Sequence, residues 1–126
     1  MYSTVLDLYR WDQEVTSPHP RLVSASTLQQ LFTPYVHTGA SVGPRSEAYG
    51  YGWFIGYQGS QREIEHTGEI SGFLSSNQLY PDDRLTVIVL SNLTTDSGLR
   101  TLTSFLAGTF LGFPDCAIYY DPCSEL

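Results

Sequence analysis

The sequence predicts an α+β domain in which helices cover an antiparallel meander of four strands. Three observations indicate this fold class: apolar residues recur at helical spacing near both ends of the chain, short strand-like runs fill its centre, and turn residues separate those runs. Consecutive strands joined by tight turns pair antiparallel, and helices grouped outside them cover the sheet. With 41% hydrophobic residues, the whole chain, 1–126, is expected to form a single domain or a fragment of one.

Two helices are predicted within the first segment, residues 1–34. Apolar residues follow helical spacing over about 3–15, and Ser3-Thr4 at the start of this stretch is a suitable N-cap. Two prolines then interrupt the pattern, after which Ser24 or Ser26 can cap a short second helix. This N-terminal part of the chain is therefore expected to be helical.

The central segment, residues 49–92, is predicted to be the antiparallel sheet. A glycine-containing loop over 35–48 precedes it, and the four expected strands cover 49–57, 62–67, 73–80 and 85–92. Apolar residues return to helical spacing over 97–111, which predicts a final helix. The remaining residues, 112–126, are expected to be an irregular tail.

The last predicted strand has apolar residues on both faces. The run Leu85–Leu90 is interrupted only by Thr86, a pattern typical of a strand that is buried between layers and paired on both edges. In a simple meander this strand would instead be an edge, and an apolar edge favours pairing with another chain. We therefore expect a missing neighbour, or a homodimer through strand 85–92. The alternative is that the terminal helix covers both the strand and its edge.

Charge and composition exclude several classes of function. A net charge of -7, with six arginines and no lysine, argues against nucleic-acid binding. The longest apolar run is too short to span a bilayer, and residues 1–10 lack the basic and apolar regions of a secretion signal. His19 and His37 have no acid or cysteine at ligand spacing, so we expect no metal and no cofactor. Cys116 and Cys123 are compatible with a disulfide or with two free thiols.

Five short motifs follow one another along the chain. They are the helix start Tyr2-Ser3-Thr4, the run Gly50-Tyr51-Gly52-Trp53, the tripeptide His66-Thr67-Gly68, the turn Pro81-Asp82 and the strand end Leu90-Ser91-Asn92. Each motif is weak alone, but their order and spacing together are specific. In this order they resemble the C-terminal region of the serine β-lactamase and penicillin-binding protein superfamily, in its class C-like branch with DD-peptidases and esterases. The resemblance covers about residues 2–111.

The resemblance implies roles for four consecutive residues. In that superfamily the third motif lies on a sheet strand beside the nucleophile, and His66 and Thr67 take the places of the basic and hydroxyl groups that hold the substrate. Gly68 would let the substrate approach the backbone closely, and the backbone N–H of Glu69 would donate to the oxyanion hole. Glu69 departs from the small residue usual at its position, and its carboxylate is expected to favour ester-like over anionic substrates.

His66 also has a purely structural interpretation. It is preceded by Glu63 and Glu65 and followed by Glu69, so it could be a solvated histidine paired with acids. The pair Asp82-Asp83 is interpreted as part of a turn rather than as two catalytic carboxylates. The tripeptide therefore has to be judged by where the fold places it.

The nucleophile of the superfamily is missing. It is a serine activated by a lysine one helical turn later, and this chain has no lysine. A Ser-His-Asp substitute would need a serine on a strained elbow, and we expect none here. The resemblance thus implies the C-terminal region of a serine hydrolase that acts on a β-lactam, peptide or ester, inactive alone and from a family that is often exported. The alternative is a non-catalytic, self-associating binding or assembly domain derived from that fold.

Overall fold

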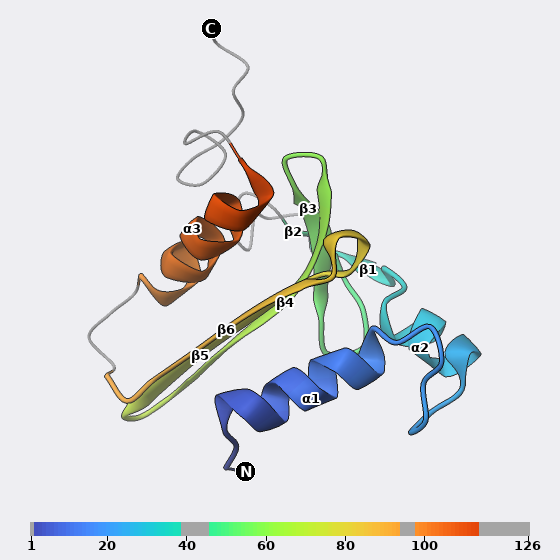
Figure 1. The fold of residues 1–126 in the computed structure, drawn as a ribbon, viewed down its shortest axis with the longest axis horizontal. Helices are drawn as coiled ribbons and strands as arrows, with labels where there is room; N and C mark the ends of the chain where they lie inside the picture. Colours follow the sequence, from blue (N-terminus) through green and yellow to red (C-terminus); the bar gives the residue numbers. More distant parts are fainter. Residues whose placement is uncertain (1, 39–45, 94–97, 114–126) are drawn as a thin grey trace, which may run out of the picture.

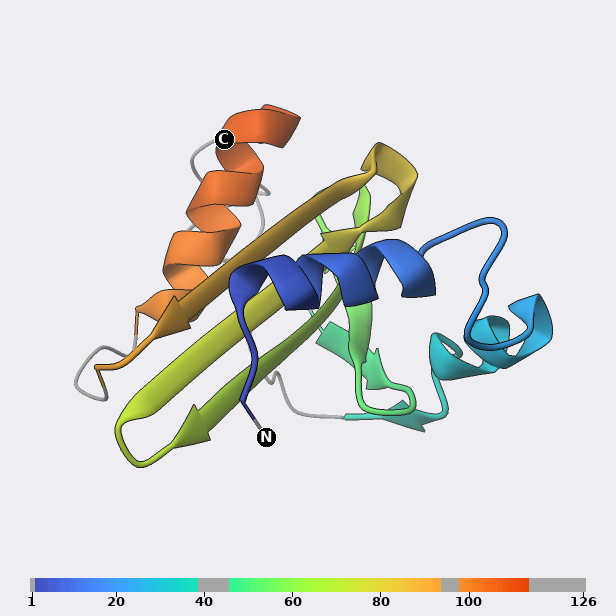
Figure 2. The same ribbon diagram turned by 60° about the horizontal axis from the view of Figure 1, so that its bottom comes forward.

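A six-stranded antiparallel sheet forms the centre of the protein, with helices on both of its faces (Figures 1 and 2). The computed structural model describes residues 2–38, 46–93 and 98–113. The strands follow the chain order β1 to β6 across the sheet. In sequence the elements are α1 (Val5–Val15), α2 (Ala25–Leu31), β1 (Val36–His37), β2 (Ser46–Tyr49), β3 (Phe54–Gln58), β4 (Gln61–Ile70), β5 (Phe73–Tyr80), the 3-10 turn η1 (Pro81–Asp83), β6 (Leu85–Ser91) and α3 (Leu99–Leu111).

The predicted fold class is confirmed, and the sheet is larger than expected. The four predicted strands correspond to β3, β4, β5 and β6. Two short strands, β1 and β2, form mostly within the segment 35–48 that was expected to be a loop, and β2 pairs with β3. Tyr49, predicted as the start of strand 49–57, is instead the last residue of β2, and the following strand begins only at Phe54. Strands of two and four residues are too short to show an alternating pattern of apolar and polar residues in the sequence.

The first two helices begin at the side chains that the sequence suggested. The Thr4 hydroxyl accepts a hydrogen bond from the Asp7 N–H at 3.2 Å, and the Ser24 hydroxyl accepts one from the Thr27 N–H at the same distance. The third helix ends at Gly112, whose left-handed φ of 69° is the conformation of a helix C-cap. Residues 114–126 of the expected tail, with both cysteines, lie outside the described residues.

Alternate residues of β5 show which helix covers which face of the sheet. The Asn77 side chain donates to Asp12 of α1, whereas Ser76 and Gln78 contact hydroxyl groups of α3. Because successive side chains of a strand point to opposite faces, α1 and α3 lie on opposite sides of the sheet. Figure 2 shows the two helices on either side of the long strands.

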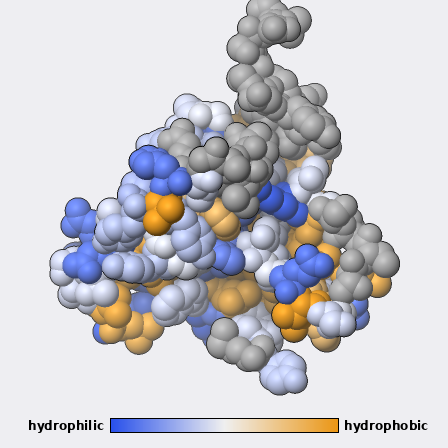
Figure 3. Space-filling view, turned by 180° about the vertical axis from the view of Figure 1, so that it is seen from behind, coloured by the Kyte–Doolittle hydropathy of each residue, from blue (hydrophilic) through white to orange (hydrophobic). Residues whose placement is uncertain are grey.

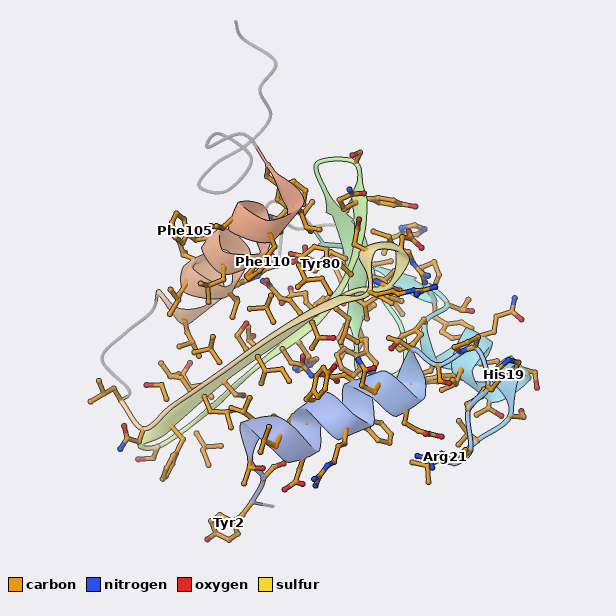
Figure 4. The ribbon with its side chains drawn as sticks, viewed as in Figure 1. Tyr2, His19, Arg21, Tyr80, Phe105 and Phe110 are labelled. Atoms are coloured by element: carbon orange, nitrogen blue, oxygen red, sulfur yellow. The ribbon has the colours of Figure 1, made fainter. Side chains whose placement is uncertain are left out.

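The buried residues form two clusters. The larger one joins the two N-terminal helices to the sheet and consists of Val15, Leu28, Trp53, Ile64 and Leu79. The other lies under α3 and consists of Tyr80, Val87 and Ala107. Figure 4 shows Tyr80 between the sheet and α3, where its hydroxyl lies 2.5 Å from Gln58 Oε1 and 3.2 Å from Glu63 Oε1. The α3 face is therefore held by polar as well as apolar contacts.

The last strand, β6, is an edge of the sheet in the described structure. It pairs with β5 along its whole length, and no described strand pairs with its other side. Both α1 and α3 contact it. Val87 is buried, whereas Leu90 is 39% exposed. The faces of the strand are thus largely covered, while its outer backbone edge has no strand partner among the described residues.

The molecular surface mixes polar and apolar areas. Figure 3 shows separate hydrophobic patches among hydrophilic ones, including one toward the end of the sheet where the long hairpin of β4 and β5 turns. Exposed apolar residues near this turn are Ile70, Phe73 and Leu93. Among the described residues no helix has the length and apolar character needed to cross a bilayer.

Candidate substrate-binding site on strand β4

Strand β4 has two halves with different neighbours. Residues 61–65 pair with β3 on one side, and from Ile64 onward β4 pairs with β5 on the other. Beyond Glu65 no described strand lies on the β3 side, so the stretch 66–70 has one open edge. In an antiparallel strand the N–H and C=O groups of one residue point toward one side, and those of the next residue point toward the other side. The groups of this stretch that face the open edge are therefore available to a ligand. The predicted tripeptide begins at this change.

His66 is held by contacts within the protein. Its Nδ1 lies 2.5 Å from the Thr67 carbonyl oxygen, and its Nε2 lies 3.0 Å from the Tyr49 hydroxyl. Since a carbonyl oxygen only accepts, Nδ1 carries the proton, and the Nε2 of a neutral ring then accepts from Tyr49. The Phe54 ring, 5.6 Å away between centroids, packs beside the imidazole.

The two acids that precede His66 on β4 have other partners. Glu65 contacts Arg100 at 2.5 Å, and Glu63 contacts Tyr80. Both acids face the α3 side of the sheet, whereas His66 faces the α1 side because it alternates with them along β4. The interpretation of His66 as a solvated histidine paired with these acids is therefore not what the structure shows.

The remaining predicted site residues are close to solvent. Thr67, Gly68 and Glu69 are all exposed. A Cβ at Gly68 would lie 2.5 Å from the hydroxyl oxygen of Ser75 on the neighbouring strand. Glycine was expected here to let a substrate approach, and the fold supplies another reason for it: the side chain of Ser75 occupies the space that a Cβ would need.

A hollow of about 410 Å³ lies between the start of α1 and the open half of β4. Its lining includes Tyr2, Ser3 and Leu8 at the start of α1, together with Gly68 and Glu69 from the open half of β4. Figure 4 shows Tyr2 at the N-terminal end of α1. The fold thus brings the helix-start motif beside the His-Thr-Gly motif, although more than sixty residues separate them in the chain.

Two sequence patterns complicate the choice of site. The tripeptide His-Thr-Gly occurs a second time at His37-Thr38-Gly39, where His37 is an exposed residue of β1. The run Gly39-Ala40-Ser41-Val42-Gly43 matches Gly-x-Ser-x-Gly, which corrects the expectation that no serine has an elbow-like sequence. A nucleophile elbow links a strand to a helix, whereas the described elements on either side of this run are the antiparallel strands β1 and β2. Ser41 itself lies outside the described residues.

The comparison with known families agrees with this geometry. A family model described as Beta-lactamase matches residues 1–107. The match covers most of the chain. The chain belongs to the beta-lactamase family. No curated protein matches the chain. The beta-lactamase match includes the start of α1, all of β4 and most of α3, so it spans both walls of the hollow.

The contacts around the site include residues that sequence patterns did not identify. Tyr49, at the end of β2, contacts His66 through a hydrogen bond, and β3 lies between their strands in the sheet, so the contact depends on the pairing of β2 with β3, which the sequence did not predict. Within the described residues no group of three or more histidine, cysteine or acidic side chains is placed to bind a metal ion. The candidate site of this beta-lactamase-family chain therefore consists of backbone, hydroxyl, imidazole and carboxylate groups.

Proposed function

We propose that this chain forms the substrate-binding wall of a serine hydrolase that transfers acyl groups from a β-lactam, peptide or ester, and that the chain is inactive alone. The observation that carries the proposal is the open half of β4, residues 66–70, whose outer backbone edge has no partner among the described strands and lies beside the hollow at the start of α1. In acyl transfer the negative charge develops on the carbonyl oxygen, and backbone N–H groups are suitable donors to it. In this proposal the Glu69 N–H is such a donor, and His66, Thr67 and Gly68 flank the substrate.

The absence of lysine supports inactivity of the chain alone. The Ser-x-x-Lys pair that generates the nucleophile in related hydrolases cannot be formed from a sequence without lysine. The nucleophile would then be supplied by sequence outside residues 1–126. Reading the coding sequence upstream of Met1 tests this: a Ser-x-x-Lys motif there supports the proposal, and an unrelated domain there contradicts it.

The charges around the open half favour an uncharged substrate. Both ring nitrogens of His66 already contact Tyr49 and a backbone carbonyl, so the imidazole is not free to bind a carboxylate. Glu69 adds an exposed carboxylate to the open half of β4, within a chain of net charge -7. An ester or a neutral amide avoids the repulsion that an anionic substrate would meet.

A self-associating assembly domain is the second candidate, and the outer edge of β6 supports it. Two copies could pair their β6 strands antiparallel about a two-fold axis, which would satisfy both edges at once. Sedimentation distinguishes the candidates, because a stable dimer is expected only for the second. In that case Leu90→Lys, which places a charge beside the edge, should dissociate the dimer, whereas Gln30→Lys on exposed α2 should not. A monomeric wild-type protein contradicts this candidate.

A further inference from the structure

Asp12 is a fully buried carboxyl group on the face of α1 that packs against the sheet. Its exposed fraction is 0%, and Asn77 of β5 donates a hydrogen bond from Nδ2 to Asp12 Oδ1 at 2.9 Å. Burying an ionised carboxylate is costly unless a cation or several donors compensate it. The groups around Asp12 therefore determine whether its carboxyl group is protonated or ionised in the folded protein.

The charged groups that the structure describes on the neighbouring strands have other partners or face away from Asp12. Asn77 lies between His66 of β4 and Ile88 of β6 in the sheet, so the nearest titratable neighbour on these strands is His66, whose ring nitrogens contact Tyr49 and a backbone carbonyl. Arg62 of β4 also faces the α1 side, but it lies four residues from His66 along the strand, and its guanidinium donates a hydrogen bond to the Phe32 carbonyl at 3.4 Å. The acids of β4 at positions 63, 65 and 69 face the other side of the sheet, and β6 has no titratable residue.

The other charged groups of α1 are engaged elsewhere. Asp7 pairs with Arg10 at 3.0 Å in solvent. Glu14, two residues after Asp12, pairs with Arg21 and accepts backbone hydrogen bonds from the N–H groups of Arg21 and Leu22. These bonds, the one from Arg21 first, hold the pKa of Glu14 below its usual range. Glu14 is thus stabilised as a carboxylate by partners that Asp12 does not share.

The atoms without partners indicate how Asp12 is accommodated. In the described structure Asp12 Oδ2 and Asn77 Oδ1 are both buried and have no hydrogen-bond partner. They belong to the two groups that are already joined through Oδ1 and Nδ2. If Asp12 is ionised, both oxygens only accept and repel each other. If Asp12 is neutral, its O–H can donate to Asn77 Oδ1 and close a ring of two hydrogen bonds.

We propose that Asp12 and Asn77 form a latch between α1 and the sheet, closed by two hydrogen bonds while Asp12 is protonated and weakened when Asp12 ionises. Burial raises the pKa of Asp12 from its ordinary 3.8 to about 6, against the opposing effect of the Asn77 hydrogen bond. The start of α1 also lines the hollow beside Gly68 and Glu69. A rise in pH that weakens the latch therefore loosens the helix that forms one wall of that hollow.

The sign of the pH effect follows from the raised pKa. Between about pH 4 and pH 6 the folded protein keeps the proton of Asp12 and the unfolded chain loses it, so this group lowers stability as the pH rises through that window. Above about pH 6 the loss is complete. A pKa raised from 3.8 to about 6 corresponds to roughly a 100-fold loss in the folding equilibrium constant between the two ends of the window.

Asp12→Asn tests the latch in the full chain. The asparagine amide donates to Asn77 Oδ1 at every pH, so urea unfolding should show this variant roughly 100-fold more stable than wild type in folding constant at pH 7.5, and equal to it at pH 4. Asp83→Asn, in the exposed turn after β5, is the matched control and should follow wild type throughout. A difference between Asp12→Asn and wild type that does not change with pH overturns the proposal.

A direct titration keeps the proposal testable if the variant does not fold. The carboxyl carbon of Asp12 in the wild-type protein, followed by carbon-13 NMR, should titrate with a midpoint near pH 6. A midpoint at or below pH 4.5 means that Asp12 is ionised in the fold near neutral pH and overturns the latch.

Discussion

The two halves of strand β4 differ in their neighbours and in their exposure to solvent. Residues 61–65 pair with β3, Ile64 and Glu65 pair with β5 as well, and the acids of this half are buried and held by contacts with Arg100 and Tyr80. Among the described strands, residues 66–70 pair with β5 alone, and they are exposed from Thr67 onward. The comparison shows that the predicted His-Thr-Gly tripeptide begins where the strand leaves the core. Substitutions in the first half should therefore cost more stability than substitutions in the second half.

The largest loss of stability is expected for a core residue in the first half of β4. Ile64 is 0% exposed and packs in the cluster with Trp53, so Ile64→Ala should lower the free energy of unfolding by about 4 kcal/mol. The matched variant in the open half, Ile70→Ala, removes the same atoms from a side chain that is 69% exposed and should cost about 0.5 kcal/mol or less. Urea unfolding followed by tryptophan fluorescence measures both. Equal losses would remove the distinction between the halves.

A smaller loss of stability is expected where Arg100 of α3 contacts the first half of β4. Arg100 is partly exposed and contacts the buried Glu65, so Arg100→Met should cost about 2 kcal/mol, less than a fully buried pair because solvent screens the arginine. Arg10→Met breaks the exposed pair with Asp7 and should cost about 0.5 kcal/mol or less. The same unfolding experiment compares them, and a similar cost for both would mean that Glu65 gains little from Arg100.

The smallest effect concerns Gly68, at the junction of the open half with β5. Gly68→Ala should cost about 1 kcal/mol, because its Cβ would meet the Ser75 hydroxyl. In a Ser75→Ala background the hydroxyl is gone, and the next atom, Ser75 Cβ, is at an ordinary 3.9 Å, so the cost should disappear. An unchanged cost in the double variant would show that something other than Ser75 requires glycine.

Local features of the fold could be predicted from the sequence, because their causes are local. Thr4 and Ser24 cap helices through side chains three residues from their partners, and the long strands have enough residues to show a pattern. The strands β1 and β2 could not be predicted, since short paired segments have no period to detect. Side-chain contacts between elements that are far apart in the chain also could not be predicted, because no sequence pattern links their residues.

The candidate site was predicted in part. The tripeptide at His66 lies at the open edge of β4, but its contact with Tyr49 depends on the pairing of β2 with β3, which the sequence did not predict. The pair of Asp12 and Asn77 joins residues 65 positions apart, and neither belongs to a motif. A polar residue on the inner face of a helix was the only sequence signal available for Asp12, and it becomes informative only once the packing is known.

The central claim is that this beta-lactamase-family chain carries a substrate-binding wall without a nucleophile. Incubation with a serine-reactive fluorophosphonate, read by intact mass, tests it most directly. We predict no covalent adduct on the folded wild-type chain and none on Ser41→Ala, the variant of the Gly-x-Ser-x-Gly serine. A stoichiometric adduct on the wild-type chain that is absent from Ser41→Ala would contradict the claim and would identify Ser41 as an active nucleophile.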